Sequence, residues 1–350
     1  MPINLYYSTD SSRSSRSSRS SRSSRSSRSG GDVDGFYANA YHSPYLADAV
    51  TSAREGVIGA APANPVRFNH AGGGAAGNVM QWAPDVRHDI FVSDMLQSVS
   101  FSERTSGPVF EAVVTLGTTG VLLARPTEDE ICAPDQLGIV LGCAKLRRER
   151  EAEIHTQITD LLPFFGTVIN LNPDKHKHTI ELLELVIDCA VLCHHQMKHR
   201  LAVKRPSEID PRVQPMIPVP GHASCPSGHA TEATVASNVL VKILEAAWGV
   251  DANDQYLPQV KDQLQQHAKR IAFNRVVAGL HYPIDNTTGE TLGAALAAYF
   301  TIRLKNADGK GAILNQIWEK ACDEWRGVSR VVLAAEQADG DTPTLPADPE

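Results

Sequence analysis

Two cations lie close together near the end of an apolar stretch of this 350-residue chain. Lys198 is followed, after six residues, by the pair Arg205-Pro206. A spacing of seven is about two helical turns, so both cations would project from one helix face. A planar guanidinium can grip two oxygens of a tetrahedral oxyanion, and an ammonium group adds a point charge. Taken alone, the pair fits a solvated basic patch equally well.

The second pattern opens a predicted helix. Pro226, Ser227, Gly228 and His229 directly precede residues 230–244, which are rich in apolar side chains. A Ser-Gly pair at a helix start exposes backbone N–H groups, and the helix dipole adds positive potential there. Gly228 allows an anion to approach the backbone closely. His229 would then act beside the anion as a general acid or base. The alternative is an ordinary serine cap followed by a chance histidine.

The third pattern joins an arginine, a histidine and an aspartate. Arg275 is followed after five residues by His281, and Asp285 comes after three more. Gly279 can end the helix that carries Arg275, and Pro283 lies near the start of the next helix. Asp285 can reach back to one ring nitrogen of His281 and fix its tautomer, which makes the other nitrogen a better nucleophile or ligand. A loop histidine with a capping aspartate is the alternative.

Taken together, the three patterns predict one oxyanion pocket. Lys198, Arg205 and Arg275 would surround a tetrahedral anion with three cations. The formal net charge of the chain is −7. Burying such a cluster of positive charges costs free energy unless an anion binds among them. A Ser-His-Asp hydrolase built on Ser227 fits less well, because three cations suit a multiply charged centre better than an acyl intermediate. A helical bundle with an inert anion site is a further alternative.

In order and spacing, the motifs K-x6-R-P, P-S-G-H and R-x5-H-x3-D resemble the signature of the phosphatidic acid phosphatase type 2 and vanadium haloperoxidase superfamily. The resemblance covers residues 198–285 in detail, together with the helical context on both sides. One departure is Asn274, because many members have a serine before the arginine. We expect little consequence, since Arg275 carries the charge.

The resemblance implies a role for each matching residue. His281 would attack phosphorus or ligate vanadium as the metal ligand, and Asp285 would orient it. His229 would protonate the leaving group of a phosphate ester or serve as acid and base on bound peroxide. The oxygens of phosphate or vanadate would be bound by Lys198, Arg205, Ser227, Gly228 and Arg275. Both chemistries use a trigonal-bipyramidal centre, which is a ground state for vanadate and a transition state for phosphoryl transfer.

Two activities of the superfamily compete for this sequence. A helical region precedes the motifs, and His222 lies seven residues before His229, where bromide-oxidising members resemble this chain in having a histidine. These features favour a soluble haloperoxidase-like enzyme that uses vanadate as cofactor and halide and hydrogen peroxide as substrates, with His222 near the cofactor or halide. The alternative is an acid phosphatase-like phosphoric monoester hydrolase with a phosphohistidine intermediate and no cofactor. In its favour, the loop 207–225 is short for a halide pocket.

The elements that position these residues are predicted to be helices. Apolar residues recur at helical spacing over 134–163 and again after Asp174, and Pro206 should stop the helix that carries Lys198. Strand signals within 106–125 are weak and interrupted by glycines. The predicted fold class is all-α, a helical bundle of the acid phosphatase and haloperoxidase type. Beyond a Pro-rich loop at 211–226, the later helices are expected at about 228–248, 257–278, 285–304 and 311–326.

Composition divides the chain into four parts. Residues 1–30 form a Ser/Arg-rich tail that is predicted to be disordered, and 31–82 are an irregular segment. Residues 83–330 form a single helical domain, and 331–350 an acidic tail that contains prolines. Six of the 33 basic residues and one of the 40 acidic residues lie in the first tail, so the rest has 27 against 39, a net charge of −12. Such an acidic body argues against nucleic-acid binding.

Cellular location is inferred from features that the sequence lacks. No apolar stretch reaches 18 residues, no secretory leader is evident, and the six cysteines have no zinc-type spacing. We therefore expect a cytoplasmic protein with reduced thiols and no membrane contact, acting on a small molecule. Members of the superfamily often form dimers, so a homodimer is expected from the resemblance, although the sequence identifies no interface.

Overall fold

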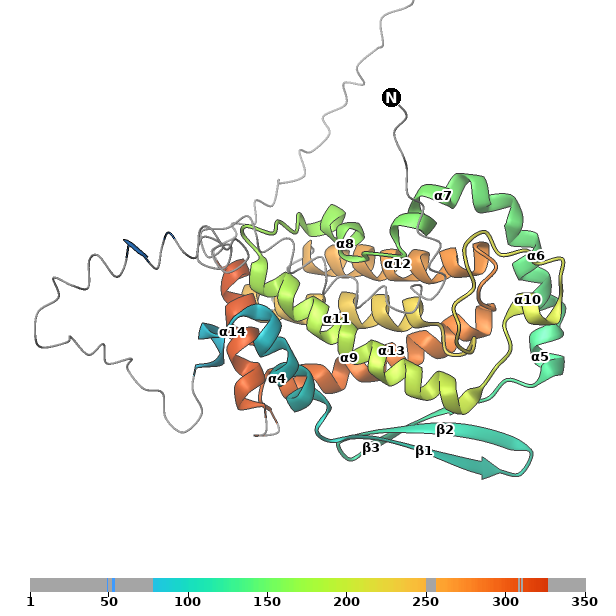
Figure 1. The fold of residues 1–350 in the computed structure, drawn as a ribbon, viewed down its shortest axis with the longest axis horizontal. Coiled ribbons are helices and arrows are strands. Elements are labelled where there is room, and N and C mark those ends of the chain that lie inside the picture. Colours follow the sequence, from blue (N-terminus) through green and yellow to red (C-terminus); the bar gives the residue numbers. More distant parts are fainter. Residues whose placement is uncertain are drawn as a thin grey trace, which may run out of the picture.

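A computed structural model of the chain describes residues 78–249, 256–307 and 311–326, together with Gly309 and residues 49, 52 and 53. These residues form a mostly helical structure (Figure 1), which confirms the predicted class. The tails predicted at 1–30 and 331–350, and most of the segment 31–82, lie outside the described residues.

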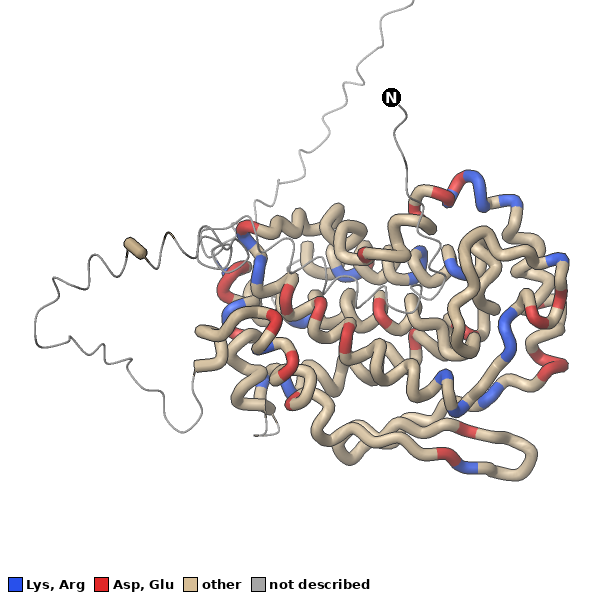
Figure 2. Tube along the Cα trace, in the orientation of Figure 1, with Lys and Arg blue, Asp and Glu red and all other residues tan. Residues whose placement is uncertain are grey.

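Helix α11 (Gly228–Trp248) lies at the centre of the bundle (Figure 1). It packs against α9 (Lys177–Leu201), α12 (Tyr256–Val277), α13 (Pro283–Leu304) and α14 (Ala312–Arg326). These bounds agree with the predicted helices to within a few residues. Most of the charged residues lie on the surrounding elements, such as α7 (Arg147–Thr156), whereas the tube of α11 is largely uncharged (Figure 2).

Two glycines bring α13 unusually close to α11. A Cβ atom at Gly289 would lie 2.6 Å from the carbonyl oxygen of Ser227, and one at Gly293 would lie 2.7 Å from that of Thr231. Only glycine fits at such distances between backbones. The start of α13, which carries Asp285, is thereby held against the start of α11, which carries the P-S-G-H motif.

The segment before α9 is more broken than the sequence predicted. Residues 134–163 do not form one regular α-helix, because a π turn and a 3-10 turn interrupt the run that ends at Thr156, and a non-helical segment separates it from the helix that begins at Leu162. These pieces and their neighbours are α4 (Pro84–Leu96), α5 (Glu128–Cys132), η3 (Pro134–Gly138), α6 (Ile139–Cys143), η4 (Ala144–Leu146), α7 and α8 (Leu162–Ile169), with η2 (Val79–Gln81) preceding α4. The bidentate pair of Arg87 on α4 and Glu181 on α9, at 2.6 Å, ties this layer to the bundle.

A three-stranded antiparallel sheet is the one departure from an all-helical fold among the described residues. Strands β1 (Val99–Ser106), β2 (Val109–Leu116) and β3 (Thr119–Ala124) pair in sequence order. Gly107 and Gly117 take positive φ angles of 61° and 63° in the tight turns. Two of the glycines that weakened the strand prediction therefore form the turns between strands, whereas Gly120 lies within β3 and pairs with Thr115. The sheet runs along one edge of the bundle, where β2 contacts α9 (Figure 1).

Candidate active site

The two cations of the first motif reach the site from different elements. Lys198 lies in the last turn of α9, but the helix ends at Leu201 because Ala202 adopts a left-handed conformation with φ 50°. Arg205 follows in extended backbone as the cap of α10 (Pro206–Ile209), which Pro206 begins. The prediction that one helix face carries both cations, and that Pro206 stops that helix, is therefore wrong. Both side chains are nevertheless buried, at 1% and 2% exposed.

The contacts of His281 define its tautomer. Nη1 of Arg205 lies 3.0 Å from Nε2 of His281, and a guanidinium can only donate, so Nε2 accepts and carries the lone pair. Nδ1 of His281 then holds the proton and donates it to Oδ2 of Asp285 at 3.0 Å, as the sequence predicted. Burial, followed by the charges of Arg205 and Lys198, holds the pKa of His281 well below its ordinary value. The ring is therefore neutral, with a nucleophilic nitrogen beside a guanidinium.

Asp285 is fixed by several donors that the sequence did not reveal. Its Oδ2 also accepts from Oγ of Ser224 at 2.5 Å and from the backbone N–H of Tyr282 at 3.1 Å. The N–H of Ser227 donates to the carbonyl oxygen of Asp285 at 2.9 Å. Burial raises the pKa of this carboxyl group, and its hydrogen-bond donors oppose that shift. Asp285 thus orients His281 and joins α13 to the start of α11.

Carbonyl groups hold the cations in place. Nζ of Lys198 donates to the carbonyl oxygens of Ala223 at 3.2 Å and Ser224 at 2.8 Å. Arg205 donates to the carbonyl oxygens of Leu280 and His222, and its Nη2 lies 3.0 Å from Nδ1 of His222. Burial, and then the charge of Arg205, lowers the pKa of Lys198 to about 7. A bound anion would raise this pKa again, so that Lys198 would be fully protonated in the complex.

The P-S-G-H motif begins α11 as predicted. The Ser227 side chain accepts from the N–H of Ala230 at 3.4 Å, so its hydroxyl acts as the helix cap. The N–H groups of Gly228 and His229, in the first turn, have no acceptor within the helix. Nε2 of His229 donates to the carbonyl oxygen of Gln157 at 2.8 Å. Burial, and then the charge of Arg275, lowers the pKa of His229 to about 4.

Arg275 retains unused donors beside His229. Its Nη2 donates to the carbonyl oxygen of Ile154 at 3.0 Å and to Oε1 of Gln157 at 2.9 Å. Its Nε and Nη1 are buried and have no hydrogen-bond partner among the residues that the structure describes, which is costly unless another acceptor binds there. Gln157 was not identified from the sequence, because nothing in its local pattern marks it. Asn274, the departure from the family motif, donates to Gln157 at 3.1 Å and so supports the residue that holds Arg275.

A buried histidine–glutamate pair packs against Gly228, and the sequence did not reveal it. Nε2 of His194 lies 2.9 Å from Oε1 of Glu232, which joins α9 to α11. A Cβ atom at Gly228 would lie 3.1 Å from the His194 ring and 3.2 Å from the Glu232 carboxylate. Gly228 is therefore needed for this packing as well as for the approach of an anion.

Gly228→Ala should displace the His194–Glu232 pair and narrow the anion site. We expect the free energy of unfolding to fall by about 1–3 kcal/mol, as is usual when a methyl group is forced into a packed site. Vanadate binding should weaken as well. Denaturant unfolding and a vanadate titration would measure both effects. Gly142→Ala is the matched control, because a Cβ atom there has nothing within 4 Å. Equal stability and affinity in the two variants would contradict the close packing at Gly228.

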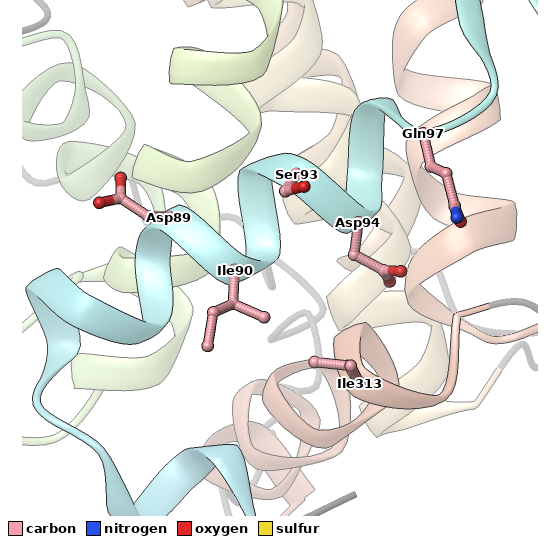
Figure 3. A pocket seen from close by; sticks show the side chains of 6 residues that line it. All are labelled: Asp89, Ile90, Ser93, Asp94, Gln97 and Ile313. Atoms are coloured by element: carbon pink, nitrogen blue, oxygen red, sulfur yellow. The ribbon is translucent and has the colours of Figure 1, made fainter.

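Two surface hollows differ in their charge. One, of about 500 Å³, borders the site through Lys198 and His222. The other, of about 440 Å³, lies between α4 and α14 (Figure 3), and two aspartates contribute to its wall. Its lining residues are Asp89, Ile90, Ser93, Asp94, Gln97 and Ile313. The carboxylates make the second hollow unsuitable for an oxyanion, so the first is the one that concerns the site.

Comparisons with known proteins find similarity to solved structures but not to any sequence family. No protein family and no curated protein matches the sequence. Among solved structures, the chain is similar to a transmembrane PAP2-type phosphatidylglycerolphosphate phosphatase from Bacillus subtilis. The identity is 20% and the TM-score 0.38, over 50% of this chain and 84% of that one.

The cytoplasmic location predicted from the sequence is corrected by this comparison. The similar structure belongs to a transmembrane protein, so the prediction is withdrawn. Among the residues that the structure describes, no helix combines the length and the apolar character that a membrane span requires.

Proposed function

We propose that this protein is a phosphoric monoester hydrolase of the phosphatidic acid phosphatase type 2 superfamily. The observation that carries the proposal is the state of His281, whose Nε2 lone pair lies against the Arg205 guanidinium while Asp285 holds the proton on Nδ1. A neutral imidazole with a fixed tautomer is a suitable nucleophile for phosphorus. The cation beside it suits the charge of a transferred phosphoryl group.

The proposed reaction has two steps. Lys198, Arg205 and Arg275, with the N–H groups at the start of α11, bind the phosphoryl oxygens. Nε2 of His281 forms a bond to phosphorus as the ester P–O bond breaks, and His229 gives a proton to the departing oxygen. Water then attacks phosphorus, His229 takes its proton, and the N–P bond breaks to release phosphate. Arg275 contributes its two unpartnered buried donors to the oxygens of the transferred phosphoryl group.

A vanadate-dependent haloperoxidase is the second candidate, and the same residues fit its cofactor. His281 offers Nε2 as a ligand, and the buried Nε and Nη1 of Arg275 offer donors to vanadate oxygens. Vanadate would supply a Lewis-acidic centre that activates peroxide. His222, predicted near the cofactor, contacts Arg205 directly. The hollow of about 500 Å³ beside Lys198 nevertheless suits an organic leaving group better than halide and peroxide, which would fill little of it. We therefore favour the phosphatase.

A paired assay separates the two candidates. One half measures hydrolysis of p-nitrophenyl phosphate without vanadate. The other measures bromination of an indicator dye with bromide and hydrogen peroxide after incubation with vanadate. We expect hydrolysis that vanadate inhibits, because vanadate resembles the transition state of phosphoryl transfer. Bromination without hydrolysis would instead support the haloperoxidase.

Asp285→Asn tests the orienting role of the carboxylate in the same assay. The amide keeps the size of the side chain but removes the charge that holds the proton on Nδ1 of His281. We expect kcat to fall roughly 10- to 100-fold, the range found when a group that orients a functional histidine is lost. A fall in kcat of less than about threefold would indicate that Asp285 acts only as a helix cap.

A further inference from the structure

A hollow at the mouth of the site has a lining suited to anions. It lies between the end of α9 and the loop that precedes α11, and its volume is about 500 Å³. Among the described residues that line it, none carries a carboxylate and none has a large aliphatic side chain. The lining residues are His195, Lys198, His199, Ala202, Gly221, His222 and Ala223. Such a wall disfavours an acyl chain and favours a polar, negatively charged group.

Contacts connect this hollow to the reacting nitrogen. His222 lines the hollow, and its Nδ1 lies 3.0 Å from Nη2 of Arg205. The other terminal nitrogen of the same guanidinium, Nη1, lies 3.0 Å from Nε2 of His281. One side chain thus separates the hollow from the phosphoryl site. A substrate that places one phosphate at His281 would have the rest of its structure within reach of the hollow.

The donors of the hollow complement a second phosphate. Nδ1 of His222 lies 3.0 Å from Nη2 of Arg205, which can only donate, and 3.2 Å from the carbonyl oxygen of Ala223, which can only accept. The shorter contact, with a permanently charged guanidinium, favours the lone pair on Nδ1 and the ring proton on Nε2, which can then donate to a ligand. The ring of His195 packs edge-on against His222, with 5.2 Å between centroids. His199, four residues after His195 on α9, is exposed beside them. The nearby carboxylate of Glu232 is already bound to His194, which lies between it and His195.

We propose that this hollow binds a second phosphate group of the substrate, one that remains on the alcohol when the first is transferred. This inference rests on the proposed phosphatase function and names its substrate class as small bisphosphorylated alcohols. The reaction consumes the bisphosphate and water and yields the monophosphate of the alcohol and inorganic phosphate.

Substitutions that change the charge of residues lining the hollow test the proposal. The substrates are propane-1,3-diol bisphosphate and propane-1,3-diol monophosphate, compared by kcat/KM. We expect the wild type to prefer the bisphosphate by about tenfold or more. His199→Glu should reduce kcat/KM for the bisphosphate roughly tenfold, with a change of less than about twofold for the monophosphate, because the added charge faces only the second phosphate. Gly221→Lys should strengthen the preference; a Cβ atom there has nothing within 4 Å.

His155→Glu is the matched control, since it makes the same exchange at an exposed position of α7 that does not line the hollow. A wild type without preference, or an equal loss on both substrates in His199→Glu, would overturn the proposal. Binding of propane-1,3-bisphosphonate and propylphosphonate, measured by calorimetry, separates it from the proposed function. If the bisphosphonate binds more tightly than propylphosphonate, and His199→Glu abolishes this difference, the anion subsite is supported. If neither ester is turned over in the same preparation, the phosphatase function is rejected while the subsite stands. Equal binding of the two phosphonates would reject the subsite.

Discussion

His281→Ala should reduce the hydrolysis of phosphate esters by roughly 10⁴-fold or more, the scale of loss when a nucleophile is removed. The variant keeps Lys198, Arg205 and Arg275, so the substrate still has cations to bind. It lacks Nε2 of His281, whose lone pair lies 3.0 Å from the guanidinium of Arg205. Rapid quenching of the wild type with radiolabelled substrate should trap an acid-labile, base-stable phosphoenzyme, and the variant should give none.

Two controls separate chemistry from folding in this experiment. His281 is buried, so its loss leaves the Asp285 carboxylate with one donor fewer, and the far-ultraviolet circular dichroism and the denaturation midpoint of the variant must be measured. His267→Gln is the matched histidine variant, because that side chain lies on α12 and contacts Thr167, outside the site. A phosphoenzyme that forms at the wild-type level in folded His281→Ala would assign the nucleophile to another residue.

Two contacts of the candidate site could be predicted from the sequence because they are short-range. Asp285 reaches His281 within a single helical turn, and Ser227 caps the helix that it begins. Such contacts depend on spacing and residue type alone. Gln157 and Glu232 could not be found in this way. Gln157 meets Arg275 across 118 positions of the sequence, and the partner of Glu232 is 38 positions away, so tertiary packing alone brings them together.

The fold was predicted least well where local signals conflicted. Residues 99–124 hold β-branched and apolar residues interrupted by glycines, and only pairing between strands shows that Gly107 and Gly117 are turns. The end of α9 was also misplaced. Pro206 is a strong helix-stop signal, yet the left-handed conformation of Ala202 ends the helix earlier, and alanine gives no warning of it. The two residues between Ala202 and Arg205, Val203 and Lys204, allow that arginine to turn toward His281.

His229→Gln should produce a loss that depends on the leaving group. As the proposed general acid, His229 matters most when the departing alkoxide is a strong base, so hydrolysis of an alkyl phosphate should fall by about 10²–10⁴-fold. Formation of the phosphoenzyme from p-nitrophenyl phosphate, followed as the burst of nitrophenolate, should slow much less, because nitrophenolate departs without a proton. The second step, in which His229 takes a proton from water, is common to both esters. When both substrates are measured on the same enzyme preparation, each serves as the control for the other.

The pH dependence gives the same prediction an independent test. Burial and the charge of Arg275 lower the pKa of His229 to about 4, which favours the neutral ring. A phosphate dianion bound beside the ring favours the charged form and raises this pKa. An acid must carry its proton to act, so kcat for the alkyl phosphate should decline as the pH rises through the pKa of the complex. His229→Gln should remove that decline. An unchanged decline in the variant, or an equal loss in the rate of phosphoenzyme formation from both esters, would assign proton transfer to another group. Lys198, whose pKa of about 7 also permits it to donate, would be the residue to test next.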